Sequence, residues 1–132
     1  MIGYAVFVLI IQKEGINIFG ELNMKNDIKD KYPKTIDTFM NTTGEMLKLF
    51  VKKQTDYGPT NIGMGLAQVK EDEDIQRSLL GLSVRMNDKV QRLMNLTFNQ
   101  QKPNNESIED NLLDIANYAV MALIVKKGKW GQ

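Results

Sequence analysis

The chain has 132 residues, of which 17 are Lys or Arg and 16 are Asp or Glu, so its formal net charge is only +1. A charge this close to zero provides no long-range field for attracting nucleic acid or an anionic membrane. Cys and His are absent, which excludes disulfides, thiol nucleophiles and the usual zinc ligands. Carboxylates remain as candidate ligands for a hard cation such as Mg²⁺. We therefore expect one domain that binds neither membranes nor nucleic acid directly.

Residues 1–34 are predicted to be an N-terminal extension. The apolar run from Tyr4 to Ile11 is too short to span a membrane, which takes about 20 residues, and no basic residue precedes it as in a signal peptide. Its β-branched residues are compatible with a small hairpin or an edge strand. The interpretation that we favour is that Met24 is the native start and that residues 1–23 are translated from upstream sequence. Residues 24–34 read as a loose lead-in that ends at Pro33.

The first long helix is predicted from Thr35 to about Lys53, within a domain that covers residues 35–132. Thr35 is a suitable N-cap residue. Apolar residues then recur every three or four positions, at Ile36, Phe39, Met40, Met46, Leu47, Phe50 and Val51. The sequence Asp56-Tyr57-Gly58-Pro59 predicts a turn directly after this helix.

A second helix is predicted over residues 66–96, with Gly81 as a candidate interruption. Its apolar positions repeat at Ile75, Leu79, Leu82, Met86, Val90 and Leu93. A polar stripe runs beside them, formed by Arg85, Asp88, Lys89 and Arg92. The acidic run at residues 71–74 is interpreted as solvated charge that favours a helix N-terminus.

The last helix is predicted to begin near Asn105 as its cap and to end at about Lys126, with Gly128 in the left-handed conformation after it. Trp130 is expected to fold back on the surface or to contact a second subunit. At helical spacing Glu106, Asp110, Asp114 and Asn117 form one stripe on an otherwise apolar helix. Like charges stacked on one face repel each other, so a metal, a basic side chain or both should lie against the stripe.

The two polar stripes would meet if the last two helices packed as an antiparallel pair. The fold class predicted from these patterns is all-α, a small antiparallel helical bundle with a charged seam. Asp88 would then bring a fourth carboxylate to the seam, which favours a metal. Arg85, Lys89 and Arg92 would bring cations, which could neutralise the stripe without an ion. The pattern is compatible with both interpretations.

Three segments with the right order and spacing carry a resemblance to a known family. They are Lys53-Gln-Thr-Asp56-Tyr57-Gly58, then Gly81-Leu82-x-x-Arg85-Met86-x-Asp88-Lys89-x-x-Arg92-Leu93, then Glu106-Ser107-x-x-Asp110-x-x-x-Asp114-Ile115-Ala116-Asn117-Tyr118-Ala119. Together they resemble the nucleotide modification associated domain, type 1, which is common in bacteriophage genomes. The resemblance covers roughly residues 39–123.

That family looks like a member of the MazG-like all-α nucleoside-triphosphate pyrophosphohydrolases, which are helical proteins that assemble as dimers or tetramers. The resemblance therefore implies a MazG-like bundle completed by oligomerisation as a homodimer or homotetramer. It implies a cytoplasmic location, in the host cell if the chain is phage-encoded. It also implies cleavage of a (deoxy)nucleoside triphosphate with Mg²⁺, or Mn²⁺ in its place, held by carboxylates.

The resemblance also assigns roles to individual residues. The metal ligands and catalytic carboxylates would be Asp88, Glu106, Asp110 and Asp114. The substrate-binding residues would be Lys53, Asp56, Tyr57, Arg85, Lys89, Arg92 and Asn117, with the basic residues on phosphates and Tyr57 and Asn117 on base or sugar. One motif departs from the superfamily: Arg85-x-x-Asp88 stands where Glu-x-x-Glu is usual, so a cation replaces a carboxylate.

Three functions are compatible with these residues and the resemblance. The first is a Mg²⁺-dependent pyrophosphohydrolase that acts on the nucleotide pool. The second is a non-catalytic protein that sequesters or senses a nucleotide, with the charged seam partly self-neutralised. The third is a purely structural helical dimer with a buried salt-bridge network. Buried ion pairs often add no net stability over apolar side chains, so their presence favours the first two.

Overall fold

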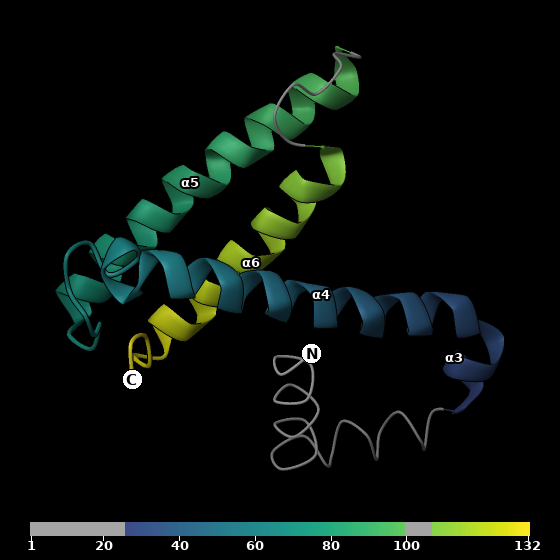
Figure 1. Cartoon of the computed structure of the whole chain (residues 1–132), viewed down its shortest axis with the longest axis horizontal. Coiled ribbons are helices and arrows are strands. Elements are labelled where there is room, and N and C mark those ends of the chain that lie inside the picture. The colour runs from purple at the N-terminus through teal and green to yellow at the C-terminus, as the bar shows by residue number, and fades with distance from the viewer. Residues whose placement is uncertain (1–25, 100–106) are drawn as a thin grey trace. The chain divides into compact units, whose positions relative to one another are not determined.

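The structure, a computed structural model, describes residues 26–99 and 107–132. Within these ranges the regular elements are helices: α3 (Asn26–Lys31), α4 (Pro33–Tyr57), the short 3₁₀ helix η1 (Pro59–Asn61), α5 (Asp72–Phe98) and α6 (Ile108–Lys126) (Figure 1). The predicted all-α fold is confirmed. No helix in this part of the chain is both long and apolar enough to span a membrane. The interpretations of residues 1–23 and of Met24 lie outside the described residues.

Contacts divide the chain into two compact units, with the boundary between Lys52 and Lys53. The first unit contains α3 and most of α4, whereas the second contains the end of α4, η1, α5 and α6. The domain boundary expected from the sequence, between residues 34 and 35, remains a prediction.

Helix α4 is longer than predicted at both ends. The prediction of a loose lead-in before Thr35 is wrong, because residues 26–31 form α3 and α4 already begins at Pro33. A proline fits the first position of a helix, where its missing N–H has no helical partner. At the other end, Asp56 and Tyr57 belong to the last turn of the helix. The chain leaves the helix only at Gly58, which has a φ of 70° and donates its N–H to the Gln54 carbonyl over 2.8 Å.

Helix α5 begins later than predicted and has no break at Gly81. Residues 66–70 are not helical, and Val69 pairs with Trp130 in an antiparallel β-bridge. The acidic residues 72–74 fill the first turn of α5, which confirms their interpretation as charges that favour a helix N-terminus. Gly81 has a packing role, because a Cβ there would lie 3.1 Å from the Met64 sulfur.

Helix α6 ends at Lys126, as predicted, and Gly128 follows with a φ of 68°. Its cap is Ser107 and not Asn105, which lies outside the described residues. The Ser107 hydroxyl accepts the Asp110 N–H over 3.0 Å, and the Asp110 carboxylate accepts the Ser107 N–H over 3.2 Å. This reciprocal capping box satisfies two N–H groups that the first turn of a helix leaves unpaired.

Helices α5 and α6 run antiparallel and pack against each other (Figure 1). Leu82 of α5 and Val125 of α6 are among the fully buried side chains of this unit. The C-terminal segment closes the core at one end of the pair. Trp130 is buried and its indole N–H donates to the Pro59 carbonyl over 3.0 Å. Trp130 does fold back onto its own chain, but it is buried in the core and not on the surface as expected.

Candidate functional site

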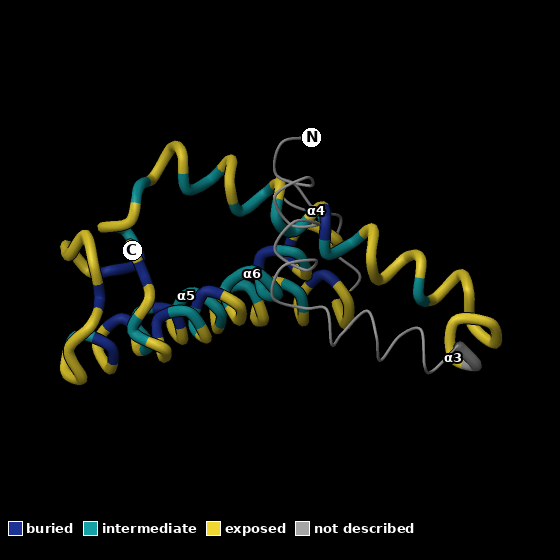
Figure 2. The backbone as a smooth tube through the Cα atoms, turned by 90° about the horizontal axis from the view of Figure 1, so that it is seen from below, coloured by how far each residue is buried: buried dark blue, intermediate teal, exposed yellow. Residues whose placement is uncertain are grey.

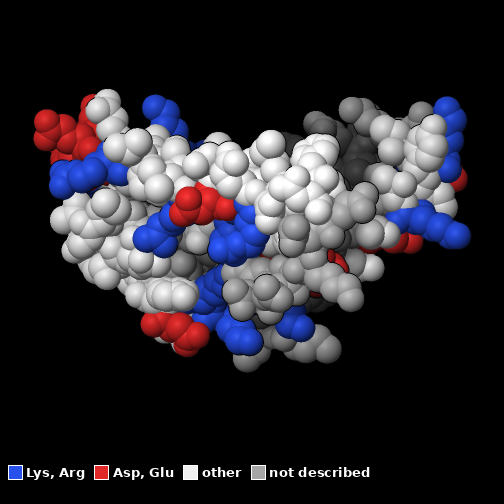
Figure 3. Space-filling model, turned by 90° about the horizontal axis from the view of Figure 1, so that it is seen from above, with Lys and Arg blue, Asp and Glu red and all other residues white. Residues whose placement is uncertain are grey.

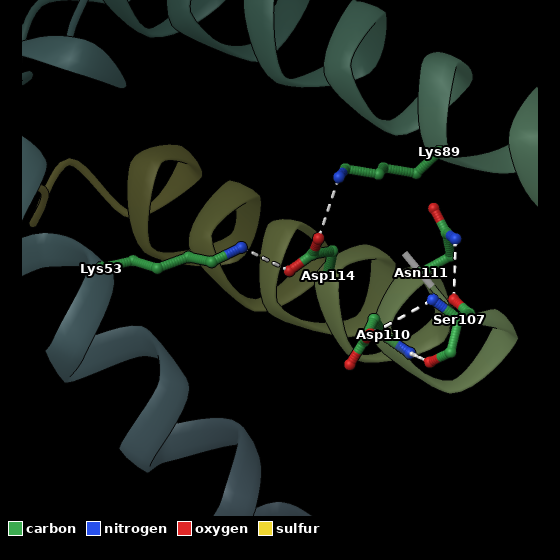
Figure 4. Close-up of polar contacts among 6 residues, drawn as sticks. All are labelled: Lys53, Lys89, Ser107, Asp110, Asn111 and Asp114. Atoms are coloured by element: carbon green, nitrogen blue, oxygen red, sulfur yellow. Dashed lines mark hydrogen bonds and ion pairs between the residues drawn. The ribbon is translucent and has the colours of Figure 1, made fainter. Parts of the chain in front are cut away.

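The centre of the candidate site is the carboxylate of Asp114, which is buried on α6. Two ammonium groups reach it from different helices (Figure 4). Lys53 Nζ, from the end of α4, lies 2.7 Å from Oδ1, and Lys89 Nζ, from α5, lies 2.9 Å from Oδ2. Each carboxylate oxygen is therefore held by one lysine. We refer to Lys53, Lys89 and Asp114 as the lysine clamp.

The helical spacing explains how the clamp forms. Lys89 is seven residues from Leu82, or about two turns, so it lies on the same side of α5, facing α6. Its side chain is 15% exposed, whereas that of Lys53 is 43% exposed. Lys89 is thus the less exposed lysine of the clamp, and Lys53 is the more solvent-accessible one.

Burial and the neighbouring charges act in opposite directions on the pKa of Asp114. Burial disfavours its ionised form and by itself raises the pKa. The hydrogen bonds and positive charges of Lys53 and Lys89 outweigh burial and bring the pKa below its ordinary value. Asp114 is therefore ionised near neutral pH.

Two polar residues organise the start of α6 next to the clamp. Asp110 is exposed and forms the capping box with Ser107, so one of its oxygens is already engaged. Asn111 is fully buried and donates its side-chain N–H to the Ser107 carbonyl over 2.8 Å. Its Oδ1 has no hydrogen-bond partner among the described residues. Asn111 is three residues from Asp114 and so lies close to the same face of α6.

The other predicted residues of α5 do not join the clamp. Arg85 donates from Nη2 to the backbone and side-chain oxygens of Asn61, over 3.2 and 2.9 Å. Asp88 and Arg92 are exposed, and helical spacing places Asp88 off the side that faces α6. Arg85 thus ties α5 to the end of η1.

The remaining predicted residues lie at the end of α4 and on α6. Asp56 and Tyr57 are exposed in the last turn of α4, and Asn117 is half-buried on α6. Glu106 lies outside the described residues. Of the predicted site residues, the structure brings Lys53, Lys89 and Asp114 into direct contact.

Sequence reasoning missed Asn61 and Asn111. The position of Asn111, three residues before Asp114, could have indicated it. No comparable signal marked Asn61, because its contact with Arg85 joins η1 to a helix residue 24 positions further along the chain.

The Mg²⁺ site expected at Asp114 remains a prediction. No group of three or more acidic side chains that could hold a metal ion occurs among the described residues, which do not include Glu106. Both oxygens of Asp114 are occupied by ammonium groups, and a metal ion would have to displace them. The groups that face Asp114 in this arrangement are the two lysine ammonium groups.

Comparison with known proteins adds one finding. A family model described as nucleotide modification associated domain 1 matches residues 53–125. The match begins at the first residue of the second compact unit and includes the whole clamp. No curated protein and no solved structure matches the chain.

Proposed function

Because the chain belongs to the nucleotide modification associated domain 1 family, we propose that it is a nucleotide-binding protein whose lysine clamp takes up the phosphates. One observation carries this proposal: two lysines converge on a single buried carboxylate. A phosphate group would supply the further negative charge and the oxygens that ammonium groups bind well.

The charge at the clamp is a local feature of the protein. On the face shown in Figure 3, basic and acidic side chains form small separate groups divided by uncharged surface. The overall charge of +1 gives no broad positive field. A small phosphate compound is therefore a better match for the clamp than a long polyanion, which needs many cations in a row.

The half-exposed lysine makes the clamp accessible. Lys53 can turn its ammonium group from Asp114 toward a ligand while Lys89 keeps the carboxylate ionised. In this proposal Arg85, one helical turn from Lys89, and Arg92 extend the phosphate contacts along α5. Tyr57 is exposed at the end of α4 and is proposed to stack on the base. Asp56 and Asn117 are proposed to contact base or sugar.

A second candidate function is pyrophosphate release from a (deoxy)nucleoside triphosphate, which the MazG-like resemblance implies. The observation that favours it is the placement of Asp110 and Asp114 one turn apart on α6, with Asp110 exposed. Together with Asp88 and Glu106, these are the carboxylates proposed to hold Mg²⁺ or Mn²⁺ and to act in catalysis. The ion would neutralise phosphate charge when bound. A homodimer or homotetramer, a cytoplasmic location and a phage origin likewise stay predictions.

The test compares ligand binding with and without metal. Thermal shift is measured with a panel of (deoxy)nucleoside triphosphates in EDTA and in Mg²⁺, on the wild type and on Lys53→Met and Lys89→Met. Lys52→Met is the matched control, because it removes the same charge from an exposed neighbour of Lys53 on α4. Phosphate release in the presence of added pyrophosphatase is measured on the same samples.

The clamp proposal expects at least one nucleotide to raise the Tm in EDTA. This shift should be lost in Lys53→Met and Lys89→Met and kept in Lys52→Met. If every shift needs Mg²⁺ and disappears in Asp110→Asn, the phosphate site is a metal site and the clamp proposal fails. Turnover that is lost in Asp110→Asn and Asp114→Asn would establish the second candidate.

A further inference from the structure

Arg85 of α5 is held by neutral oxygen atoms and not by a carboxylate. Its Nη2 donates to the Asn61 carbonyl over 3.2 Å and to the Asn61 Oδ1 over 2.9 Å. No carboxylate in the described part of the chain pairs with this guanidinium. Asn61 therefore fixes the guanidinium in place without cancelling its charge, whereas both lysines of the clamp face Asp114.

Arg85 lies on the same edge of α5 as Lys89. Buried, half-buried and exposed residues alternate along α5 with the period of the helix (Figure 2). Leu82 is buried against α6, whereas Val84 is exposed, and Arg85 and Lys89 are both half-buried between these two sides. Residues four positions apart share one face of a helix and lie about 6 Å apart along its axis. The guanidinium and the clamp are therefore neighbours along one edge of α5.

The backbone that carries Asn61 is anchored on both sides. Before it, the Pro59 carbonyl accepts the indole N–H of the buried Trp130 over 3.0 Å. After it, Ile62 is buried in the core, and the N–H of Gly63 donates back to the Pro59 carbonyl over 3.0 Å. The two oxygens of Asn61 therefore have a fixed position, and they define where the guanidinium stands.

We propose that Asn61 is a positioning residue of the phosphate site, which orients Arg85 toward a second phosphate of the ligand held at the clamp. This role rests on the proposed function, because it requires a phosphate at the clamp. The Nε and Nη1 groups of Arg85 make no bond to the described residues, and phosphate oxygens accept such N–H groups well. Ordering an arginine side chain costs conformational entropy. Asn61 imposes that order before the ligand arrives, so the cost does not fall on binding.

Two other roles of Asn61 lead to different results. If Asn61 only ties α5 to η1, its removal loosens the fold and changes the ligand affinity by the same factor whatever residue stands at position 85. If Asn61 restrains Arg85 away from the ligand, its removal strengthens binding. A positioning residue acts on the ligand only through Arg85, so its removal weakens binding and has little effect once Arg85 is replaced.

A double-mutant cycle on ligand affinity separates these roles. Tripolyphosphate is titrated in EDTA by calorimetry into the full chain as the wild type, Asn61→Ala, Arg85→Lys and the double variant. Arg85→Lys keeps the charge but lacks the planar group that Asn61 holds. The control Asn87→Ala removes the same side chain from an exposed position of α5. Orthophosphate is titrated as well, because a single phosphate at the clamp does not need Arg85.

The expected loss of tripolyphosphate affinity in Asn61→Ala is about fivefold, which is the effect of one hydrogen bond. In the Arg85→Lys background the same substitution should change the affinity by less than about twofold. Asn87→Ala should bind tripolyphosphate as the wild type does, and orthophosphate should bind equally to the wild type and Asn61→Ala. An unchanged tripolyphosphate affinity in Asn61→Ala, an equal loss in both backgrounds, or tighter binding would each overturn the role of Asn61.

Asn61→Asp is the second variant, should the alanine variant not fold, because it keeps an acceptor oxygen for the guanidinium. It holds Arg85 by an ion pair and cancels the charge that the ligand needs. The Tm should therefore not fall, while the affinity for tripolyphosphate falls about tenfold. Thr60→Asp adds the same charge to the exposed neighbour of Asn61 and should have a smaller effect. Equal losses of affinity in these two variants would overturn the role of Asn61.

A wrong role for Asn61 and a wrong clamp give different results. If the clamp is not a phosphate site, Lys53→Met binds tripolyphosphate as tightly as the wild type, or the wild type does not bind it, and the role of Asn61 is overturned with the clamp. If only the role of Asn61 is wrong, Lys53→Met loses affinity for tripolyphosphate and Asn61→Ala keeps it.

Discussion

Replacing Asp114 by Asn separates a lysine clamp from a metal site, because the two arrangements predict opposite effects on ligand binding. In the clamp, the carboxylate holds Lys53 over 2.7 Å and Lys89 over 2.9 Å. Asn keeps the shape and one acceptor oxygen, but it replaces the other oxygen by a donor that faces an ammonium group. One charge-assisted hydrogen bond is therefore lost, and the negative charge that faces the two lysines is removed.

The size of the stability effect follows from burial. A hydrogen bond to a charged group contributes about 1.5–3 kcal/mol. Lys53 is 43% exposed, and solvent screening reduces its share, whereas Lys89 is only 15% exposed. We expect Asp114→Asn to lower the free energy of unfolding by about 2 kcal/mol at pH 7. For a chain of this length that corresponds to a fall in Tm of roughly 6–10 °C.

The effect on ligand binding should have the opposite sign. Removing the carboxylate releases both lysines for phosphate, so tripolyphosphate in EDTA should bind Asp114→Asn about fivefold more tightly, or by about 1 kcal/mol. Calorimetric titration on the folded variant measures this, with circular dichroism to verify the fold. A metal ligand at Asp114 would instead make the variant bind less tightly in Mg²⁺. Weaker tripolyphosphate binding by a folded Asp114→Asn would rule out the clamp as a phosphate site.

Three further predictions concern stability. The pKa of Asp114 is lowered by folding, so its stabilising contribution is present above the unfolded pKa of about 4 and is lost as the pH falls through the folded pKa. The difference in urea-unfolding free energy between wild type and Asp114→Asn should therefore shrink below about pH 4, and a constant difference down to pH 2 would contradict the ion pairing. Trp130→Phe keeps the apolar bulk but loses the bond to the Pro59 carbonyl, and chemical denaturation should show a loss of about 1 kcal/mol; an unchanged midpoint would mean that this bond adds nothing. Ser107→Ala removes the cap of α6 and should lower the free energy of unfolding by about 1 kcal/mol in the same measurement. The control is Ser83→Ala on the exposed face of α5, which should have a smaller effect.

The sequence predicted the all-α fold and the end of α6 because these depend on local patterns. Apolar residues at helical spacing specify α5 and α6, and Gly128 ends α6 in the left-handed conformation that glycine adopts readily. The predicted start of α6 was wrong because Asn and Ser are both favourable N-cap residues, and the sequence has Asn105 and Ser107 two positions apart. The reciprocal bond between Ser107 and Asp110 is what places the cap at Ser107.

The site was predictable only in part, because its contacts join residues far apart in the chain. Charge patterning indicated that cations would lie against the stripe on α6, and Lys89 fulfils this at Asp114. The same pattern could not rank Lys89 above Arg85, which reaches Asn61 of η1 instead. Lys53 is 61 residues from Asp114. The resemblance assigned it to substrate binding, but no spacing rule predicted its contact with the carboxylate.

The claim that Lys53 and Lys89 form a phosphate site is tested most directly by titrating tripolyphosphate into the protein in EDTA. The titration is made by calorimetry on the wild type, on Lys53→Met, on Lys89→Met and on the control Lys52→Met. A phosphate site at the clamp predicts binding by the wild type and by the control, and at least a tenfold loss of affinity in each of the other two variants. Equal affinity in all four proteins, or no binding by the wild type, would show that the clamp is not a phosphate site.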